Sequence, residues 1–231
     1  MTTSTDKPDY LGHRQRLRER FEVDDGRSMP DYELLEFLLT AFIPRRDVKP
    51  IAKRLLAKFK DLAGVFSASR SELEEVDGIK SVASNYLKAI HTSNIRSNWR
   101  TLQSDDAPII CKTEVLEDYC RSAMAHLDIE ECRLLYLNTK MQLIGEEILQ
   151  RGTINHVAIH PREIVKHALQ QGATSVIMVH NHPSGDATPS KADIELTRQI
   201  NVALRAIEIN MLDHIIVSKN MVYSLKAHHL F

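Results

Sequence analysis

The chain has 231 residues, more than one domain usually contains, so two compact units are expected. Its content of 43% hydrophobic and 26% charged residues excludes a disordered or fibrous protein. The formal net charge of −1 combines a slightly basic first half with a slightly acidic second half. This balance permits contact between the first half and nucleic acid but does not require it.

The cysteines and the apolar segments indicate the cellular compartment of the protein. An odd number of cysteines without a Cys-x-x-Cys pair argues against a disulfide framework and against a cysteine zinc ribbon. No apolar segment approaches the roughly 18 residues that cross a bilayer, and the first ten residues contain no hydrophobic signal core. We therefore predict a cytoplasmic protein without membrane contact, and the sequence indicates no oligomeric state. The cysteines are Cys111, Cys120 and Cys132.

The first half, residues 1–100, is predicted to be a helical domain. Its apolar residues recur at helical spacing, with strong helix formers and few β-branched runs. Pro44 ends one of the expected helices, and Pro50 lies in the first turn of the next, where proline is tolerated. Helices are expected over 32–43, over 48–59, and as a pair within 67–90.

The pair of helices within 67–90 is joined by a tight turn at Gly78. The segment VDGIKSVASNYL, residues 76–87, resembles a helix-hairpin-helix module, but Lys80 replaces the second glycine of the usual motif. In such modules, backbone N–H groups at the start of the second helix face a DNA phosphate. Two interpretations stay open, namely contact with DNA and a hairpin that packs its own core or docks a protein.

A second candidate for phosphate contact is the segment HRQRLRER near the N-terminus. It places Arg14 and Arg18 one helical turn apart, as it does Arg16 and Arg20. Stripes of this kind are usually solvated faces, and we prefer that interpretation. We nevertheless predict DNA as a possible partner of the helical domain, with Lys80, Arg14 and Arg18 as the contacting residues.

The second half, residues 109–231, is predicted to be an α/β (α+β) domain with a mixed sheet flanked by helices. Residues 101–108, which are polar and end in Asp-Asp-Ala-Pro, separate it from the first half as a linker. Short β-branched and apolar runs alternate with amphipathic helical patterns. Strands are expected over 132–139, 142–150, 174–179, 212–218 and 221–225, and helices over 161–173 and 190–207.

The stretch HNHPSGDATPSKAD at the end of the third strand has the composition of a metal site. Alternation along a strand places His180 and His182 on one side, with Cα atoms roughly 6.6 Å apart, so both imidazoles can reach one ion. Proline and glycine then turn the chain, and Ser190 and Asp193 open the next helix. Asp193 would supply a third ligand and leave a fourth position for water, as in hydrolytic zinc sites.

Each of these residues also has an ordinary structural explanation. Ser190 and Asp193 have the spacing of a helix capping box, and the two histidines fit a loop beside a strand end. Without a metal site, all of these separate explanations would have to apply at once by coincidence. The metal site is therefore favoured. His214, near the start of a later strand, is expected to be a structural histidine, with support of the metal site as the alternative.

The spacing His-x-His-x7-Ser-x2-Asp is similar to that of the JAMM (MPN-domain) zinc hydrolases. Within them, the chain resembles the RadC family through HNHPSG at 180–185, HPRE at 160–163, RGT at 151–153 and DHIIVS at 213–218. The resemblance covers nearly the whole chain. It implies Zn²⁺ held by His180, His182 and Asp193, and an upstream glutamate that accepts a proton from the water. By its position before the strand CRLLYLN, Glu131 is predicted to be this general base.

The alternatives to Glu131 are weaker on the sequence. Glu130 would point the other way on a strand, and Glu146, Glu147 and Glu163 lack the context of a strand start, so surface roles are expected for them. The resemblance implies that zinc activates a water for attack on an amide carbonyl. Ser190 would then donate a hydrogen bond to the developing oxyanion.

Two functions follow from these observations. The first is a zinc metallopeptidase or isopeptidase with a protein or peptide substrate. The second is a DNA repair or recombination factor that binds DNA through the helical domain, in which the zinc is structural or nucleolytic. The letters His-Asn-His do not indicate the nuclease of that name, because the residues of that motif are scattered over a ββα unit. The residues favour the hydrolase.

Overall fold

The computed structural model describes residues 12–103, 108–152, 159–219 and 221–231. Contacts between Cα atoms divide the chain into two compact units, Met1–Thr92 and Ser93–Phe231. The division falls within helix α6 (Ser81–Gln103).

Helix α6 also crosses the domain boundary expected at residue 100. Residues 101–103 of the expected linker are the last residues of this helix. Residues 104–107 lie outside the described part of the chain, and Pro108 precedes a 3-10 helix. The expected boundaries, 1–100, 101–108 and 109–231, stay predictions.

The first unit is helical, as its sequence predicts. Ser69 and Glu72 form a capping box that starts α5, and the side chain of Asp61 caps the N-terminus of α4. The core consists of leucine, isoleucine and valine side chains at helical spacing, among them Leu35, Ile51 and Leu87. The helices are α1 (His13–Asp24), α2 (Asp31–Phe42), α3 (Lys49–Phe59), α4 (Leu62–Ser67), α5 (Arg70–Glu74) and the first part of α6.

The predicted turn between the last two helices of this unit requires glycine. Gly78 has a φ of +98°, and a Cβ there would lie 2.6 Å from Cδ1 of Ile51. The N–H of Ile79 donates to the carbonyl of Val76 across the turn, at 2.9 Å. The helical hairpin suggested by the sequence is therefore present between α5 and α6.

The second unit is built around a five-stranded mixed sheet with strand order β2-β1-β3-β4-β5. Its pairs are antiparallel except for β3 and β4, which run parallel. The expected α/β (α+β) class is thus confirmed. The strands are β1 (Glu131–Leu137), β2 (Leu143–Arg151), β3 (Ser175–Asn181), β4 (Asn210–Val217) and β5 (Val222–Ser224).

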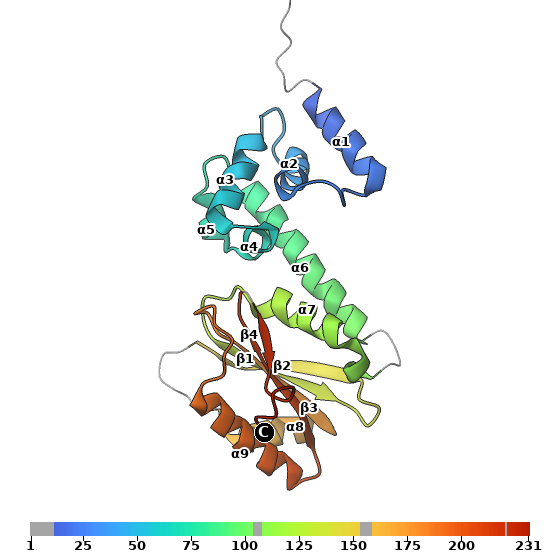
Figure 1. Cartoon of the computed structure of the whole chain (residues 1–231), viewed down its shortest axis with the longest axis vertical. Helices are drawn as coiled ribbons and strands as arrows, with labels where there is room; N and C mark the ends of the chain where they lie inside the picture. The colour runs from blue at the N-terminus through green and yellow to red at the C-terminus, as the bar shows by residue number, and fades with distance from the viewer. Residues whose placement is uncertain (1–11, 104–107, 153–158, 220) are drawn as a thin grey trace, which may run out of the picture. The chain divides into compact units, whose positions relative to one another are not determined.

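Helices cover both faces of this sheet (Figure 1). Helix α7 (Thr113–Met124) packs on one face, where Leu135, Ile177 and Ile215 point. Helices α8 (Pro161–Gln170) and α9 (Lys191–Arg205) pack on the other face, against residues such as Leu134, Tyr136 and Met178. Strands buried on both faces explain the continuous apolar runs of β1 and β3.

Helix α7 is not among the elements expected from the sequence. Its buried residues, Leu116, Tyr119, Cys120 and Met124, have helical spacing. The spacing of these apolar residues is therefore sufficient to predict this helix from the sequence.

The crossover from β3 through α9 to β4 positions the site. Because β3 and β4 are parallel, the chain must return across the sheet in a helix. The N-terminus of α9 then lies near the C-terminal end of β3, the edge where α/β sheets place their ligands. The two parts of the His-x-His-x7-Ser-x2-Asp motif meet there. Among the residues that the structure describes, no helix combines the length and apolar character needed to span a bilayer.

Candidate metal centre

Three side chains converge where β3 ends and α9 begins. Nε2 of His180 and Nε2 of His182 are 2.9 Å apart. Oδ1 of Asp193 is 3.6 Å from Nε2 of His180, and Oδ2 of the same carboxylate is 3.6 Å from Nε2 of His182. Of the described residues, these form a group of histidine and carboxylate side chains that could hold a metal ion.

The three separations fit tetrahedral coordination. Ligand atoms at about 2.0 to 2.1 Å from one Zn²⁺ ion stand roughly 3.3 Å from each other. The separations of 2.9, 3.6 and 3.6 Å bracket this value. A set of two imidazoles and one carboxylate is also the chemistry of catalytic zinc sites, which keep a fourth position for water.

A chain of hydrogen bonds fixes the tautomer of His180. The hydroxyl of Thr197 donates to the carbonyl of Asp193 at 2.5 Å, so it must accept from Nδ1–H of His214, 2.6 Å away. Nε2 of His214 then carries a lone pair and accepts from Nδ1–H of His180 at 2.6 Å. The lone pair of His180 Nε2 is therefore directed at the centre of the group.

His182 is oriented by the loop that follows it. Its Nδ1 lies 2.8 Å from the carbonyl of Asp186, which can only accept, so Nδ1 carries the hydrogen. The remaining lone pair is on Nε2, as in His180. Two lone pairs 2.9 Å apart repel each other unless the two nitrogens share a proton or a metal ion.

Burial and charge set the protonation of this group. Burial lowers the pKa of His180 to about 4, so this ring is neutral at pH 7. Burial also lowers the pKa of His214 well below its ordinary value. The Asp193 carboxylate raises the pKa of His182. Burial alone would raise the pKa of Asp193, but the neighbouring His182 ring and the N–H of Ser190 outweigh it and hold the pKa below its ordinary value.

The capping box that was considered as the alternative to a metal site is present, and the same residues also take part in the cluster. Oδ2 of Asp193 accepts from the N–H of Ser190 at 2.7 Å, and Oγ of Ser190 accepts from the N–H of Asp193 at 3.1 Å. The cap therefore orients the carboxylate toward the histidines. The Ser190 hydroxyl is exposed at the rim, and its own proton remains to donate.

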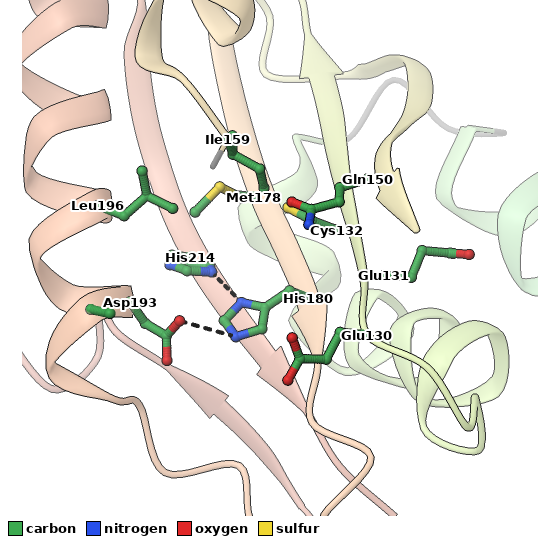
Figure 2. A pocket seen from close by; sticks show the side chains of 11 residues that line it. Glu130, Glu131, Cys132, Gln150, Ile159, Met178, His180, Asp193, Leu196 and His214 are labelled. Carbon is green, nitrogen blue, oxygen red and sulfur yellow. Dashed lines mark hydrogen bonds and ion pairs between the residues drawn. The ribbon is translucent and has the colours of Figure 1, made fainter. Parts of the chain in front are cut away.

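The expected general base, Glu131, lies on the wrong side of its strand. Its side chain is buried, with Oε1 2.6 Å from Nε of Arg133 and Oε2 3.4 Å from Nε of Arg151. Figure 2 shows it pointing away from His180 and Asp193. Both oxygens are thus paired with arginines, and the geometry does not support the role predicted for this residue.

The neighbouring Glu130 faces the cluster instead (Figure 2). Cys132 is the register partner of His180, and directly opposed residues on paired strands point to the same face. Residue 130, two positions earlier, has the same direction as Cys132. Glu130 lines the same cavity as His180 and Asp193, and its charge raises the pKa of His182.

Asn181, between the two histidines, holds the segment that carries Glu130. Its side chain is buried, and Oδ1 accepts from the N–H of Glu131 at 2.7 Å. Its Nδ2 donates to the carbonyl of Ile129 at 3.1 Å. The backbone is therefore fixed on both sides of Glu130 by the residue between the two histidines.

Comparison with known proteins agrees with the motif. Residues 110–230 match the family described as RadC-like JAB domain. The chain is also 42% identical to a UPF0758 protein of Ruegeria pomeroyi over 222 residues, which cover 95% of this chain and 98% of the relative. The chain belongs to the RadC family. The resemblance drawn from the sequence motifs is thus confirmed.

The RadC-like domain brings together four of the five residues expected to form its site. His180, His182 and Asp193 meet, and Ser190 lies beside them in the capping box. Glu131 does not join them. Glu130 lines the cavity beside them, and His214 and Thr197 form the hydrogen-bond chain behind His180. Of these three, only His214 was considered from the sequence, where support of the metal site was the alternative to a structural role. Neither the family description nor the name of the relative states an ion, so zinc stays a prediction.

The residues expected to contact DNA differ in their surroundings. The guanidinium of Arg14 donates to the carbonyls of Thr40, Ile43 and Arg46, at 3.2, 2.8 and 2.9 Å. These bonds satisfy carbonyl groups at the C-terminal end of α2 and commit the side chain to structure. Arg18 and Lys80 are exposed.

The hydrogen-bond chain behind His180 makes a prediction about metal affinity. Thr197→Val keeps the shape of the side chain but removes the hydroxyl that orients His214. We expect the affinity for Zn²⁺ to fall about 10- to 100-fold, as on removal of other groups that orient a ligand. Competition with a chromophoric chelator measures it. Thr139→Val, in an exposed turn, is the matched control, and an unchanged affinity in Thr197→Val would contradict the role given to the chain.

Proposed function

We propose that the RadC-like domain is a zinc-dependent hydrolase that cleaves an amide bond in a peptide or protein, with Glu130 as general base. The proposal rests on one observation. Two imidazole lone pairs and a carboxylate are directed at one point, and a second carboxylate faces the same cavity. A Zn²⁺ ion held by His180, His182 and Asp193 would supply Lewis acidity and lower the pKa of a water.

The remaining chemistry belongs to side chains of this chain. Glu130 is exposed at the mouth of the cavity, where its carboxylate can accept a proton from water and pass it to the leaving amine. Ser190 presents a hydroxyl proton at the rim, in position to donate to the carbonyl oxygen of the substrate. His214 and Thr197 keep the ring of His180 oriented. Asn181 keeps Glu130 in place.

Glu130 and Glu131 form a matched pair for testing the base. We expect Glu130→Gln to lower kcat about 100- to 10,000-fold without changing the affinity for Zn²⁺. Glu131→Gln should instead lower the stability, because it weakens a buried pair with Arg133, and should keep kcat in the folded protein. The assay uses zinc-loaded protein with a peptide library and isopeptide-linked substrates. Loss of kcat in Glu131→Gln alone would contradict the assignment.

Removal of the metal gives an independent test. Asp193→Asn keeps an acceptor for the N–H of Ser190 and removes the charge that a cation needs. We expect this variant, like the chelated wild type, to lose hydrolysis while its far-ultraviolet circular dichroism stays the same. Addition of Zn²⁺ should restore the chelated wild type only. Full hydrolysis by metal-free protein would refute a metal-dependent reaction.

We also propose a second function, binding of DNA by the helical unit. It is supported by the hairpin between α5 and α6, where Gly78 adopts the positive φ that the turn requires and Lys80 is exposed two residues later. A basic side chain beside a helix N-terminus suits phosphate. Arg18 is a further exposed candidate, and Arg14 is not retained because its guanidinium is bound to carbonyls.

Charge reversal at the hairpin tests this second function. Lys80→Glu should weaken binding to branched and single-stranded DNA equally across sequences and reduce the dependence on salt, as expected for one lost phosphate contact. Fluorescence anisotropy at several salt concentrations measures both effects. Lys140→Glu, an exposed change of the same charge in the other unit, is the control. Equal affinities of the two variants would argue against the hairpin as the DNA site.

A further inference from the structure

A cavity of about 360 Å³ opens beside the candidate metal centre. His180, Asp193 and Glu130 line one end of it. Figure 2 shows Met178, Leu196 and Ile159 grouped at the other end, beyond His214. We name this second end the apolar pocket, and define it by Cys132, Gln150, Ile159, Met178, Ala192 and Leu196.

Three elements build the apolar pocket. Met178 comes two residues before His180 on β3, so it points to the same face of the sheet. Leu196 lies on α9, three residues after Asp193, on the same side of the helix. Cys132 of β1 is opposite His180. Ligands and apolar residues thus alternate along the same strand and helix, which places the pocket next to any group bound by the ligands.

The lining of the pocket suits an uncharged occupant. The Cys132 thiol is buried and behaves as a small apolar group. Among the described lining residues there is no lysine or arginine to pair with an acid. Glu130 and Asp193 at the metal end would repel an acidic side chain. The charges and the apolar end together favour a substrate that is apolar next to the reacting amide.

The volume sets the size of this occupant. A cavity of about 360 Å³ is at the lower end of the range for small-molecule sites, which is roughly 300 to 1,000 Å³. Part of it lies over the ligands and is needed for the amide itself. The space that remains suits one side chain of medium size rather than a cofactor or several residues.

We propose that the apolar pocket receives a medium-sized apolar side chain, such as leucine, methionine or phenylalanine, of the substrate residue next to the bond that is cleaved. This inference rests on the proposed function, because it takes the ligand group as the reacting centre. It assigns the selection of substrate to Met178 and Leu196, which form the wall, and to Ala192, whose small side chain leaves the pocket open on its solvent side.

Hydroxamates that bind zinc test the pocket without any hydrolysis. Two probes place an isobutyl group on either side of the zinc-binding group, namely N-acetyl-leucine hydroxamate and isobutylsuccinyl hydroxamate. Each is compared with the same molecule without the isobutyl group, by calorimetry on the zinc-loaded full chain. Burial of the isobutyl group should make one of the two probes bind about 10- to 100-fold more tightly than its comparison molecule.

Two variants change the pocket in opposite directions. Ala192→Leu, at an exposed helix position, should fill the pocket and abolish the preference for isobutyl. Leu196→Ala should enlarge it and move the preference toward the benzyl group of the phenylalanine analogue. Leu169→Ala, at a position of α8 that is 58% exposed and does not line the cavity, is the matched control and should behave as wild type.

The outcomes separate this inference from the proposed function. Equal affinities with and without isobutyl for both probes, or no binding of any probe, overturn the apolar pocket. A preference unchanged in both Ala192→Leu and Leu196→Ala also overturns it. Failure to cleave any peptide while the preference holds would instead refute the hydrolase and leave the pocket standing.

Discussion

The candidate centre depends on a hydrogen bond that involves none of the ligand atoms, from the Thr197 hydroxyl to the backbone carbonyl of Asp193. This bond uses the only hydroxyl proton and forces the ring of His214 to donate to Thr197. His214 must then accept from His180. One helical turn of α9 therefore determines which nitrogen of an imidazole on β3 presents a lone pair. Helix α9 thus contributes both the carboxylate and the orientation of a histidine.

The side chains on the two faces of β1 have different roles. Those on one face line the candidate site, and those on the other face form buried ion pairs. On one face, Glu130 and Cys132 look into the cavity with His180. On the other face, Arg133 lies between the carboxylates of Glu131 and Glu146, with Oε1 atoms at 2.6 and 3.0 Å. A buried ionic group of this kind is costly to break, because removal of one member leaves a charge without its partner. Adjacent glutamates in the sequence thus have unrelated roles, set by the two-residue period of the strand.

Much of the fold and of the ligand set could be predicted from the sequence. Helical spacing identified the first unit, and the spacing from His180 to Asp193 identified three side chains that the structure brings together. The spacing could not predict which side chains of β1 face the cavity and which face the other side of the sheet. Glu131 was chosen by its place before a strand, whereas its direction depends on the pairing of Cys132 with His180, a contact between residues 48 positions apart in the chain. The contacts of Arg14 and His214 could not be predicted for the same reason, because Arg14 donates to carbonyls 26 to 32 residues away and His214 bonds to side chains 17 and 34 residues away.

Asn181 ties the reacting groups into one rigid piece. Its backbone ends the strand that carries His180 and leads directly to His182, and its side chain bonds to the peptide groups that flank Glu130. Ligands and carboxylate therefore share a single framework that is assembled before any substrate arrives. Little ordering entropy has to be lost on binding, which is the advantage of a preorganised centre over one that forms by closure of a loop.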